Sequence, residues 1–265
     1  MEDMMFIREI GIKLLHEFRT RIQFFDTEQK LEDDAQEYWN QASLKKSASH
    51  WRDNEEFDEQ NWLELGKEHM KLMNSFAGMA GLRFPVNKIV EWGCGGGANA
   101  VQFGALTKIY FGVDINAETL DECSNQMKNW GYDNFRSVLI MVDDPEAGLI
   151  DEMKDSDLFI CTYVFELIPS PEYGLRLLRL ANQVLKVGGV GLIQIRYNDL
   201  GRRHGSRKWG YKFKPYHMTT YSLEEFWNYA LAFGFQPLAI YLVPEQKIVG
   251  DVRYGYYFIK KTKNL

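Results

Sequence analysis

The sequence predicts an α/β fold in which a mostly parallel sheet, covered by helices on both faces, follows a helical N-terminal region. From residue 88 onward, short apolar runs alternate with segments long enough to form helices; the runs are KIVEWG, IYFGVD, SVLIMVD, LFICTYVF and VGLIQIRY. Runs of this kind are typical of parallel strands that are buried on both faces. Further on, FQPLAIYLV and RYGYYFIKK follow each other with no helix between them. This hairpin predicts that one C-terminal strand runs antiparallel to the rest.

The first 80 residues predict helices and little strand. Apolar residues recur at helical spacing in the segment 6–18 and again in the segment 62–73, which indicates helices with one buried face. Between them, residues 41–60 mix charged and small polar side chains without a continuous apolar face. That composition predicts a loop or a lid. We therefore expect a helical cover over residues 1–80 and a sheet domain over residues 81–265.

The first strand of the sheet ends in the stretch VEWGCGGGA, residues 90–98. Glycine at alternate positions lets the backbone approach a ligand closely, and the helix that follows directs its free N–H groups toward that ligand. As G-x-G-x-x-A the turn resembles a dinucleotide fingerprint, and as E-x-G-x-G-x-G it fits a different cofactor. Glu91 distinguishes them, because a carboxylate there repels a pyrophosphate but suits the ammonium group of S-adenosylmethionine.

Two further sets of acids follow the next two strands. Asp114 ends IYFGVD, roughly twenty residues after the glycines, where a carboxylate can accept both hydroxyls of a ribose. The alternative role for Asp114 is the N-cap of the next helix, although Asn116 is an equally good cap and would leave Asp114 for a ligand. Asp143 and Asp144 stand just before Pro145, at the exit of the third strand. Either carboxylate can accept from an adenine amino group, or it can be a solvated turn acid.

Five motifs, in this order, resemble those of class I S-adenosylmethionine-dependent methyltransferases: VEWGCGGGA, YFGVD, VDDPE, DLFICTYVFELIP and LANQVLKVGGVGLIQI. The resemblance covers roughly residues 86–260 and rests on the order and spacing of the motifs, since the glycine turn alone is a weak signal. It implies a Rossmann-like sheet of seven strands with an antiparallel C-terminal strand, as the hairpin indicates independently.

The resemblance also implies roles for individual residues. The methionine part of the cofactor would be lined by Glu91, Gly93, Gly95 and Gly97, the ribose held by Asp114 and the adenine by Asp143, with Thr162 and Tyr163 beside the sulfonium. One position departs from many relatives, which have Glu-His where this chain has Glu166 and Leu167. A histidine therefore cannot act as a base or bind substrate at that position.

The acceptor is expected beyond the carboxyl ends of the strands, where ligands of open α/β sheets bind. The loop of residues 200–217, called the basic loop below, holds six lysine and arginine residues and no acid, in a chain of formal net charge −6. It predicts binding of an anionic acceptor through Arg202, Arg203 and Arg207, with interleaved aromatic side chains as a stacking wall. The alternative is a solvated surface loop, which is what most runs of charge are.

Alignment of the nucleophile contributes most to methyl transfer, and a base is needed only when the acceptor is a hydroxyl. His217 is the predicted base, because imidazole titrates near neutral pH and this residue lies between the basic loop and a helix that begins with the capping box Ser222 to Glu225. The alternative is a histidine that packs at the start of that helix. His50 reaches the pocket only if the N-terminal loop folds over it.

The composition narrows the class of protein. Cys94, Cys123 and Cys161 are too few and too scattered for a disulfide framework, and no Cys/His pair has zinc-ligand spacing. We therefore expect a reducing compartment and no metal. The chain has no apolar stretch as long as a membrane span and starts with MEDMMFIREI, which lacks a long apolar run. A cytoplasmic protein is the expectation.

Together these observations predict an S-adenosylmethionine-dependent methyltransferase that methylates an oxygen of a small or glycan-like anionic acceptor. An RNA methyltransferase is an alternative, with the basic loop as its groove, although the acidic net charge and the lack of a separate RNA-binding module disfavour a nucleic acid partner. Two alternatives come from other classes: an NAD-dependent dehydrogenase, disfavoured by Glu91 and the hairpin, and a catalytically silent subunit that binds the cofactor. The sequence indicates no oligomeric state.

Overall fold

The structure is a computed structural model of the chain. It describes residues 25–41, 45–53, 57–198, 205–213 and 215–265. The helix predicted over residues 6–18 lies outside the described residues.

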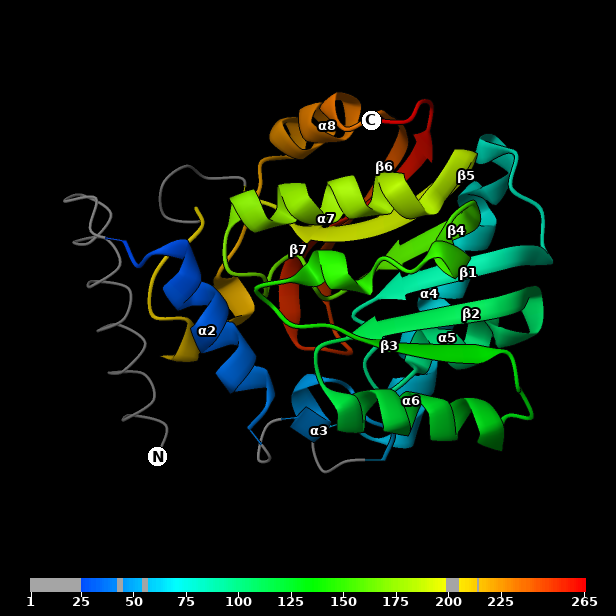
Figure 1. The fold of residues 1–265 in the computed structure, drawn as a ribbon, viewed down its shortest axis with the longest axis horizontal. Coiled ribbons are helices and arrows are strands. Elements are labelled where there is room, and N and C mark those ends of the chain that lie inside the picture. The colour runs from blue at the N-terminus through cyan, green and yellow to red at the C-terminus, as the bar shows by residue number, and fades with distance from the viewer. Residues whose placement is uncertain (1–24, 42–44, 54–56, 199–204, 214) are drawn as a thin grey trace.

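A seven-stranded sheet forms the centre of the molecule (Figure 1), in the order β3-β2-β1-β4-β5-β7-β6. β1, β2, β3, β4 and β5 pair in parallel, whereas β7 is antiparallel to both of its neighbours, β5 and β6. This confirms the predicted fold, including the C-terminal hairpin. The strands are β1 (Val86–Trp92), β2 (Thr107–Asp114), β3 (Phe135–Leu139), β4 (Ser156–Cys161), β5 (Leu185–Arg196), β6 (Phe235–Gln246) and β7 (Asp251–Lys261).

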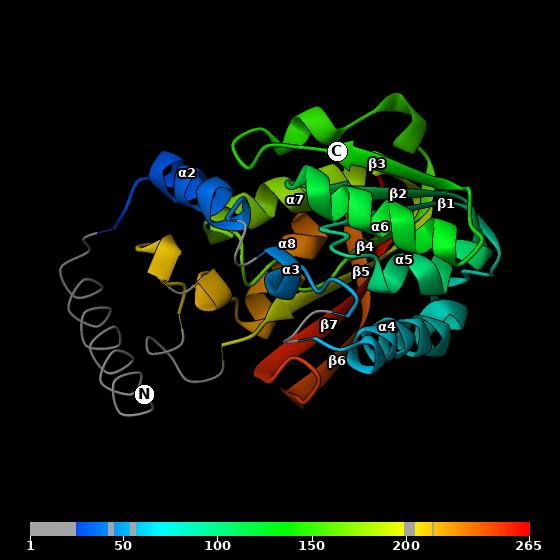
Figure 2. The same ribbon diagram turned by 90° about the horizontal axis from the view of Figure 1, so that it is seen from below.

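Helices cover both faces of the sheet (Figure 2). α4 (Glu59–Ala80), α5 (Ala98–Phe103) and α6 (Ala117–Asn129) share one apolar cluster with the strands, and α7 (Pro171–Val184) and α8 (Leu223–Ala232) share the other. Successive strand residues point to opposite faces, so Ile89 enters the first cluster and its neighbour Val90 the second. The central strands therefore read as continuous apolar runs.

α4 belongs to the same core as the sheet. It begins at Asp58, whose side chain accepts a hydrogen bond from Asn61 N, and ends at Gly81 in the left-handed conformation. Its apolar face is buried, and Phe76 packs on Phe258 of β7 with ring centroids 4.1 Å apart. Because this helix shares a core with the strands, the division at residue 80 stays a prediction.

α2 (Glu28–Trp39) and α3 (Lys45–Ala48) lie beyond the carboxyl ends of β1 and β2 (Figure 1). α2 contributes Leu31 and Ala35 to the α7 side of the core. The sequence predicts a loop or lid over residues 41–60, and within this stretch α3 is a single helical turn. It is closed by backbone bonds from Trp51 N to Lys46 O, 2.8 Å, and from His50 N to Ser47 O, 3.1 Å.

The third strand is shorter than the apolar run that predicted it. β3 ends at Leu139 and is an edge strand, because it pairs only with β2. After it the backbone finds other partners: Ile140 N donates to Asp114 O at 3.1 Å, and Val142 N donates to the side chain of Gln36 on α2 at 2.8 Å. Asp143 consequently stands in a loop, four residues beyond the strand.

The helix predicted after the basic loop is present as α8. Its capping box is complete, because Ser222 Oγ accepts from Glu225 N and Glu225 Oε2 accepts from Ser222 N, each at 3.1 Å. Across the described residues, no helix is long and apolar enough to span a membrane.

Candidate cofactor and acceptor site

Three glycines of the turn after β1 adopt backbone conformations that L side chains rarely reach. The φ angles of Gly93, Gly95 and Gly97 are +73°, +52° and +94°. Space is also limiting, since a Cβ on Gly93 would lie 2.3 Å from Val164 Cγ2 and one on Gly95 would lie 2.6 Å from Ser49 O. Glycine is therefore required at Gly93 and Gly95 both by the backbone conformation and by the close packing of Val164 and Ser49 against the turn.

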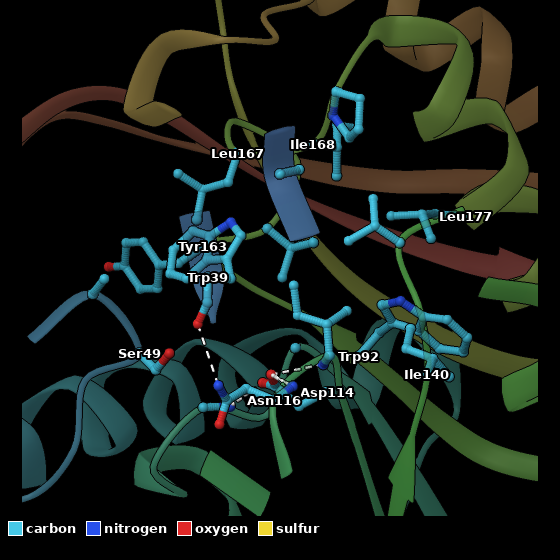
Figure 3. Close-up of a pocket in the computed structure, with 18 of the residues that line it drawn as sticks. Trp39, Ser49, Trp92, Asp114, Asn116, Ile140, Tyr163, Leu167, Ile168 and Leu177 are labelled. Atoms are coloured by element: carbon cyan, nitrogen blue, oxygen red, sulfur yellow. Dashed lines mark hydrogen bonds between the residues drawn. The ribbon is translucent and has the colours of Figure 1, made fainter. Parts of the chain in front are cut away.

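The turn forms one wall of a pocket at the carboxyl ends of the parallel strands (Figure 3). Apolar side chains make up most of the lining, and Trp39 closes the pocket from α2. The lining residues are Ala35, Trp39, Ala48, Ser49, Trp92, Gly93, Gly95, Asp114, Ile115, Asn116, Ile140, Val142, Thr162, Tyr163, Val164, Leu167, Ile168, Pro169, Tyr173, Leu177 and Tyr211.

Asp114 lies at the floor of this pocket and does not cap α6. Its Oδ2 accepts from Gly95 N at 3.1 Å, and its Oδ1 accepts from Ile115 N at 2.8 Å and from Asn116 N at 3.2 Å. The cap of α6 is Asn116, whose side chain accepts from Thr119 N. Burial raises the pKa of Asp114 to about 6, and the three N–H donors act against this rise.

Glu91 lies behind the pocket wall and is not one of its lining residues. The side chain, 1% exposed, accepts a hydrogen bond from Asn99 Nδ2 at Oε1 and one from Tyr110 Oη at Oε2, each at 2.7 Å. Asn99 Nδ2 also donates to Thr162 Oγ1, which lines the pocket. Burial raises the pKa of Glu91 to about 8, and the bonds from Tyr110 and Asn99 oppose this rise.

The network around Asn99 continues to the far end of the pocket. His69 Nδ1 lies 2.8 Å from Asn99 Oδ1, and its Nε2 lies 3.2 Å from Tyr256 Oη. Tyr256 Oη in turn lies 3.3 Å from Tyr163 Oη. Burial lowers the pKa of His69 to about 4, so the ring is neutral at physiological pH. The network thus joins Glu91 to Tyr163 through uncharged groups.

Of the remaining residues predicted to bind the cofactor, two line the pocket and two do not. Thr162 and Tyr163 line the pocket directly after β4. Gly97 is the N-cap of α5 and Asp143 is exposed, and neither is one of the lining residues. The backbone carbonyl of Asp143 accepts from Arg176 Nη2 at 3.0 Å. In the sequence neighbourhood of Asp143, it is Ile140 and Val142 that reach the pocket.

A second pocket adjoins the first, and Ala48, Tyr163 and Leu167 line both. Its walls come from the turn after α3, the segment after β4, the basic loop and the turn between β6 and β7. The residues particular to it are His50, Glu166, Tyr216, Val249, Gly250, Asp251 and Tyr254. His50 therefore does fold over the site, which the sequence left as a condition.

Two residues of the second pocket hold the strained left-handed conformation. The φ angle is +49° at His50 and +57° at Tyr163, which costs roughly 1–3 kcal/mol for a residue other than glycine. The two rings meet edge to face, with centroids 5.4 Å apart. Tyr163 also meets Tyr254 edge to face at 5.4 Å. Strain of this kind is concentrated at ligand-binding positions.

The described cations of the basic loop contact groups within the protein. Arg207 is 5% exposed, and its Nε and Nη2 donate to the carbonyls of Trp209 and Gly210, both at 3.1 Å. Lys208 pairs with Glu172 of α7 at 2.7 Å. Lys212 pairs with Glu37 and Asp34, both on α2. Arg207, Lys208 and Lys212 line neither pocket.

The structure does not describe the side chains of three further predicted residues of this segment. Arg202 and Arg203 lie outside the described residues. His217 ends a short 3₁₀ helix, Pro215–His217, and its side chain is not described. The roles of all three stay predictions.

Sequence reasoning missed three contributors to the site. α2 supplies Ala35 and Trp39 to the first pocket, and the sequence gives no local signal for their position, because it depends on docking against residues far along the chain. Glu166 lines the second pocket, where the sequence marked only the absence of a neighbouring histidine. Within the described residues, no group of three or more histidine, cysteine or acidic side chains is arranged to hold a metal ion.

Comparison with known proteins bears on the family and the fold. Residues 57–240 match the family model described as "Methyltransferase domain". No curated protein matches the chain. Among solved structures, an S-adenosylmethionine-dependent methyltransferase from Clostridium acetobutylicum is 15% identical, with a TM-score of 0.57 over 83% of this chain and 97% of that one.

Two other solved structures have a similar fold. A putative methyltransferase from Bacillus halodurans is 11% identical, with a TM-score of 0.55 over 72% of this chain and 99% of that one. The second is the 1,6-didemethyltoxoflavin-N1-methyltransferase of Burkholderia thailandensis, whose structure contains 1,6-didemethyltoxoflavin and S-adenosylhomocysteine. It is 17% identical, with a TM-score of 0.54 over 73% of this chain and 77% of that one. The family match spans well over half of the chain and includes α4 as well as the strands up to β6. The chain therefore belongs to the methyltransferase domain family of enzymes, whose cofactor is S-adenosylmethionine.

Proposed function

We propose that this methyltransferase transfers a methyl group to a hydroxyl oxygen of a small molecule. The observation that carries the proposal is the meeting of the two pockets at Tyr163 and Leu167. One pocket has the glycine turn and Asp114, and the other has a carboxylate, Glu166, that can receive a proton. Two adjoining pockets of this kind suit a cofactor and an acceptor whose reacting atoms meet at the shared wall.

The first pocket fits S-adenosylmethionine. The bare turn at Gly93 and Gly95 lets the backbone approach the methionine part, and Asp114 can accept from ribose hydroxyls with the lone pairs its three N–H donors leave. Ile140 and Val142 offer an apolar surface for adenine. We assign a structural role to Glu91, which fixes the position of Asn99 and, through it, of Thr162 in the pocket wall. When bound, the cofactor supplies the methyl group, carried on a sulfonium.

The N-terminal segments are proposed to form a cover for both ligands. Trp39 and Ala35 of α2 and Ser49 after α3 line the first pocket, and His50 lines the second. Ser49 O also accepts from Gly96 N at 2.9 Å, so the cover contacts the glycine turn directly. Exclusion of water by such a cover protects the sulfonium and strengthens polar contacts inside.

The anionic character of the acceptor stays a prediction from the basic loop. In its described part, Arg207, Lys208 and Lys212 have partners within the protein, which leaves the prediction resting on Arg202 and Arg203. If these two arginines bind an anionic part of the acceptor, replacing both with alanine raises the KM for the acceptor and leaves cofactor affinity unchanged. If the double variant has the same KM as wild type at low salt, Arg202 and Arg203 do not bind the acceptor.

A small molecule is favoured over a nucleic acid. The formal net charge is −6, and the described cations of the basic loop have partners within the protein, whereas binding of a polyanion requires cations that face it along a surface. The Burkholderia enzyme of similar fold has a small molecule bound. That enzyme methylates a nitrogen according to its name, so nitrogen acceptors belong in the screen described next.

Calorimetry tests the cofactor. We expect S-adenosylmethionine and S-adenosylhomocysteine to bind, and NAD to bind weakly or not at all. Tighter binding of NAD than of S-adenosylhomocysteine would overturn the proposal in favour of a dehydrogenase. A methyl-transfer screen over phenols, sugars, sugar phosphates, amines and RNA, read by mass spectrometry of the products, then tests the acceptor. Methylation restricted to amines or to RNA would overturn the hydroxyl assignment.

A further inference from the structure

The second pocket contains a buried carboxylate oxygen with no hydrogen-bond partner. Glu166 lines the pocket and is 2% exposed, and its Oε2 has no partner among the described residues. The other oxygen, Oε1, receives only a long bond of 3.5 Å from Gln194 Nε2. A buried carboxylate in this state destabilises the fold. Its position in the lining of a pocket points to a ligand that donates a hydrogen bond to it.

The charges near Glu166 leave one carboxylate in excess. Arg196 of β5 is buried, and its Nη1 donates to Asp251 Oδ2 at the start of β7. Arg196 thus pairs with Asp251, although its Nε has no hydrogen-bond partner among the described residues, and Glu166 forms no ion pair with any of them. An anionic group placed directly beside Oε2 is repelled by the ionised carboxylate, whereas a neutral hydroxyl can donate a hydrogen bond to it.

The charge of Glu166 changes near neutral pH. Burial, the largest cause, raises the pKa of Glu166 to about 7; Asp251 also raises it and Arg196 lowers it. Burial lowers the pKa of His50 to about 4, so that ring is neutral. Burial raises the pKa of five neighbouring thiol and phenol groups above their ordinary values, so they are neutral as well; these are Cys161, Tyr163, Tyr211, Tyr254 and Tyr256.

The shape of the pocket indicates the kind of molecule that carries the hydroxyl. Aromatic side chains from four segments line it: His50 after α3, Tyr163 after β4, Tyr216 in the basic loop and Tyr254 in β7. Tyr216 is 42% exposed, which leaves a surface for stacking at the mouth. Aromatic walls of this kind favour a planar ring, because rings gain both buried area and edge or face contacts.

We propose that the second pocket binds the acceptor through a neutral hydroxyl on a planar ring, and that Glu166 is the catalytic base that receives the hydroxyl proton. The proposal rests on the proposed transfer to oxygen. The acceptor oxygen forms a bond to the methyl carbon and gives its proton to Glu166 Oε2, while the carbon–sulfur bond breaks and its electron pair stays on sulfur. The carboxylate and the sulfonium are neutralised in the same step, so no further reactant is needed. Glu166 thereby takes the role that the sequence assigned to His217.

The first experiment measures thermal unfolding as a function of pH. An acid whose pKa is raised from 4.5 to about 7 by folding stabilises the fold below the lower value, and this stabilisation is lost as the pH rises through the higher one. Glu166→Gln lacks this loss, so we expect its Tm to rise relative to wild type by at least about 2 °C between about pH 5 and pH 8. Glu224→Gln, an exposed residue of α8, is the matched control and follows the wild type. A constant difference between Glu166→Gln and wild type would overturn the proposal.

The second experiment measures binding to the complex with S-adenosylhomocysteine, using phenol as the probe. A hydrogen bond to a charged group contributes about 1.5–3 kcal/mol, so Glu166→Gln should weaken phenol binding at least about tenfold at pH 8. Methoxybenzene has no hydroxyl and should bind wild type and variant alike. Phenol affinity of the wild type should rise with pH around a midpoint near 7, and that dependence should be absent from the variant. Equal phenol binding by wild type and Glu166→Gln would overturn the proposal, and so would a preference for benzylammonium.

Catalysis gives the third measurement once the screen has identified an acceptor. Loss of a general base lowers kcat by about 100-fold or more, and we expect Glu166→Gln to lose both this rate and the rise of kcat with pH near 7. Glu224→Gln, the exposed control on α8, should retain both. If S-adenosylhomocysteine binds and phenol does not, the assignment of Glu166 fails and the methyltransferase function stands. If S-adenosylhomocysteine does not bind, the proposed function itself fails.

Discussion

Glu91, near the end of β1, and Glu166, in the segment after β4, are both buried glutamates, but their oxygen atoms differ in hydrogen bonding. Both oxygens of Glu91 accept, from Asn99 and from Tyr110, whereas Oε2 of Glu166 has no partner among the described residues. Burial raises the pKa of each carboxyl. The same substitution should therefore have opposite effects at the two positions when the pH is above 7.

Glu91→Gln should destabilise the protein by about 1–3 kcal/mol, because one carbonyl oxygen then remains for two buried donors, Tyr110 Oη and Asn99 Nδ2. Urea unfolding at about pH 8 measures this free energy. Glu166→Gln, measured alongside, should instead gain stability relative to wild type between about pH 5 and pH 8. A Glu91→Gln variant as stable as wild type would mean that the network around Asn99 tolerates an amide.

Asp114→Ala should weaken binding of S-adenosylhomocysteine by about 1.5–3 kcal/mol, the scale for hydrogen bonds to a charged group. Calorimetry measures the affinity. Asp121→Ala, an exposed acid on α6, is the control and should bind as the wild type does. Because Asn116 caps α6, the variant should keep that helix, which circular dichroism checks. Unchanged affinity in a folded Asp114→Ala protein would remove Asp114 from the ribose site.

At the scale of elements, the basic loop and α2 bind each other through complementary charge and a hydrogen bond. α2 is acidic, and Lys212 of the loop pairs with Asp34 and Glu37 on it. Trp39 Nε1 of α2 also donates to Tyr211 Oη in the loop at 2.9 Å. In its described part, the loop's charge therefore holds two elements together over the first pocket. Local sequence reasoning could not find this, because the partners are more than 170 residues apart.

Arg207 anchors the described part of this loop. Its guanidinium donates to Trp209 O and Gly210 O and lies 5.5 Å from the Trp209 ring centroid. Arg207→Ala should cost about 1–3 kcal/mol of unfolding free energy, because buried carbonyls lose their donor. Lys208→Ala, which removes a partly exposed ion pair with Glu172, should change it by about 0–1 kcal/mol. Equal effects in urea unfolding would mean that Arg207 does not anchor the loop.

The proposed cover can be tested by limited proteolysis. Trypsin sites at Lys45, Lys46 and Arg52 flank the residues that contact the glycine turn, and Lys247 in the turn between β6 and β7 is a control site. Saturating S-adenosylhomocysteine should slow cleavage at the first three sites and leave cleavage at Lys247 unchanged, because only the cover lies over the first pocket. Uniform slowing at all four sites would indicate general stabilisation instead of closure of the cover.

At the scale of the whole molecule, the sheet was predictable because its signals are local. Apolar runs, the glycine turn and the hairpin each lie within a few residues, and the sheet has the expected seven strands with β7 antiparallel. The third strand was overestimated because an edge strand ends wherever other partners capture its backbone, here Gln36. The second pocket could not be foreseen, since its walls come from residues 48–50 and 249–254 at opposite ends of the chain.

The position of β7 has a consequence for synthesis. β7 is the last of the seven strands in the chain, yet it lies between β5 and β6, and β6 joins the sheet only through it. While residues 251–261 are still inside the ribosome, β5 presents an open edge and β6 has no partner strand. Such edges pair readily with other chains. The order of synthesis therefore makes β7 the strand that completes the sheet, because β6 cannot join β5 before residues 251–261 lie between them.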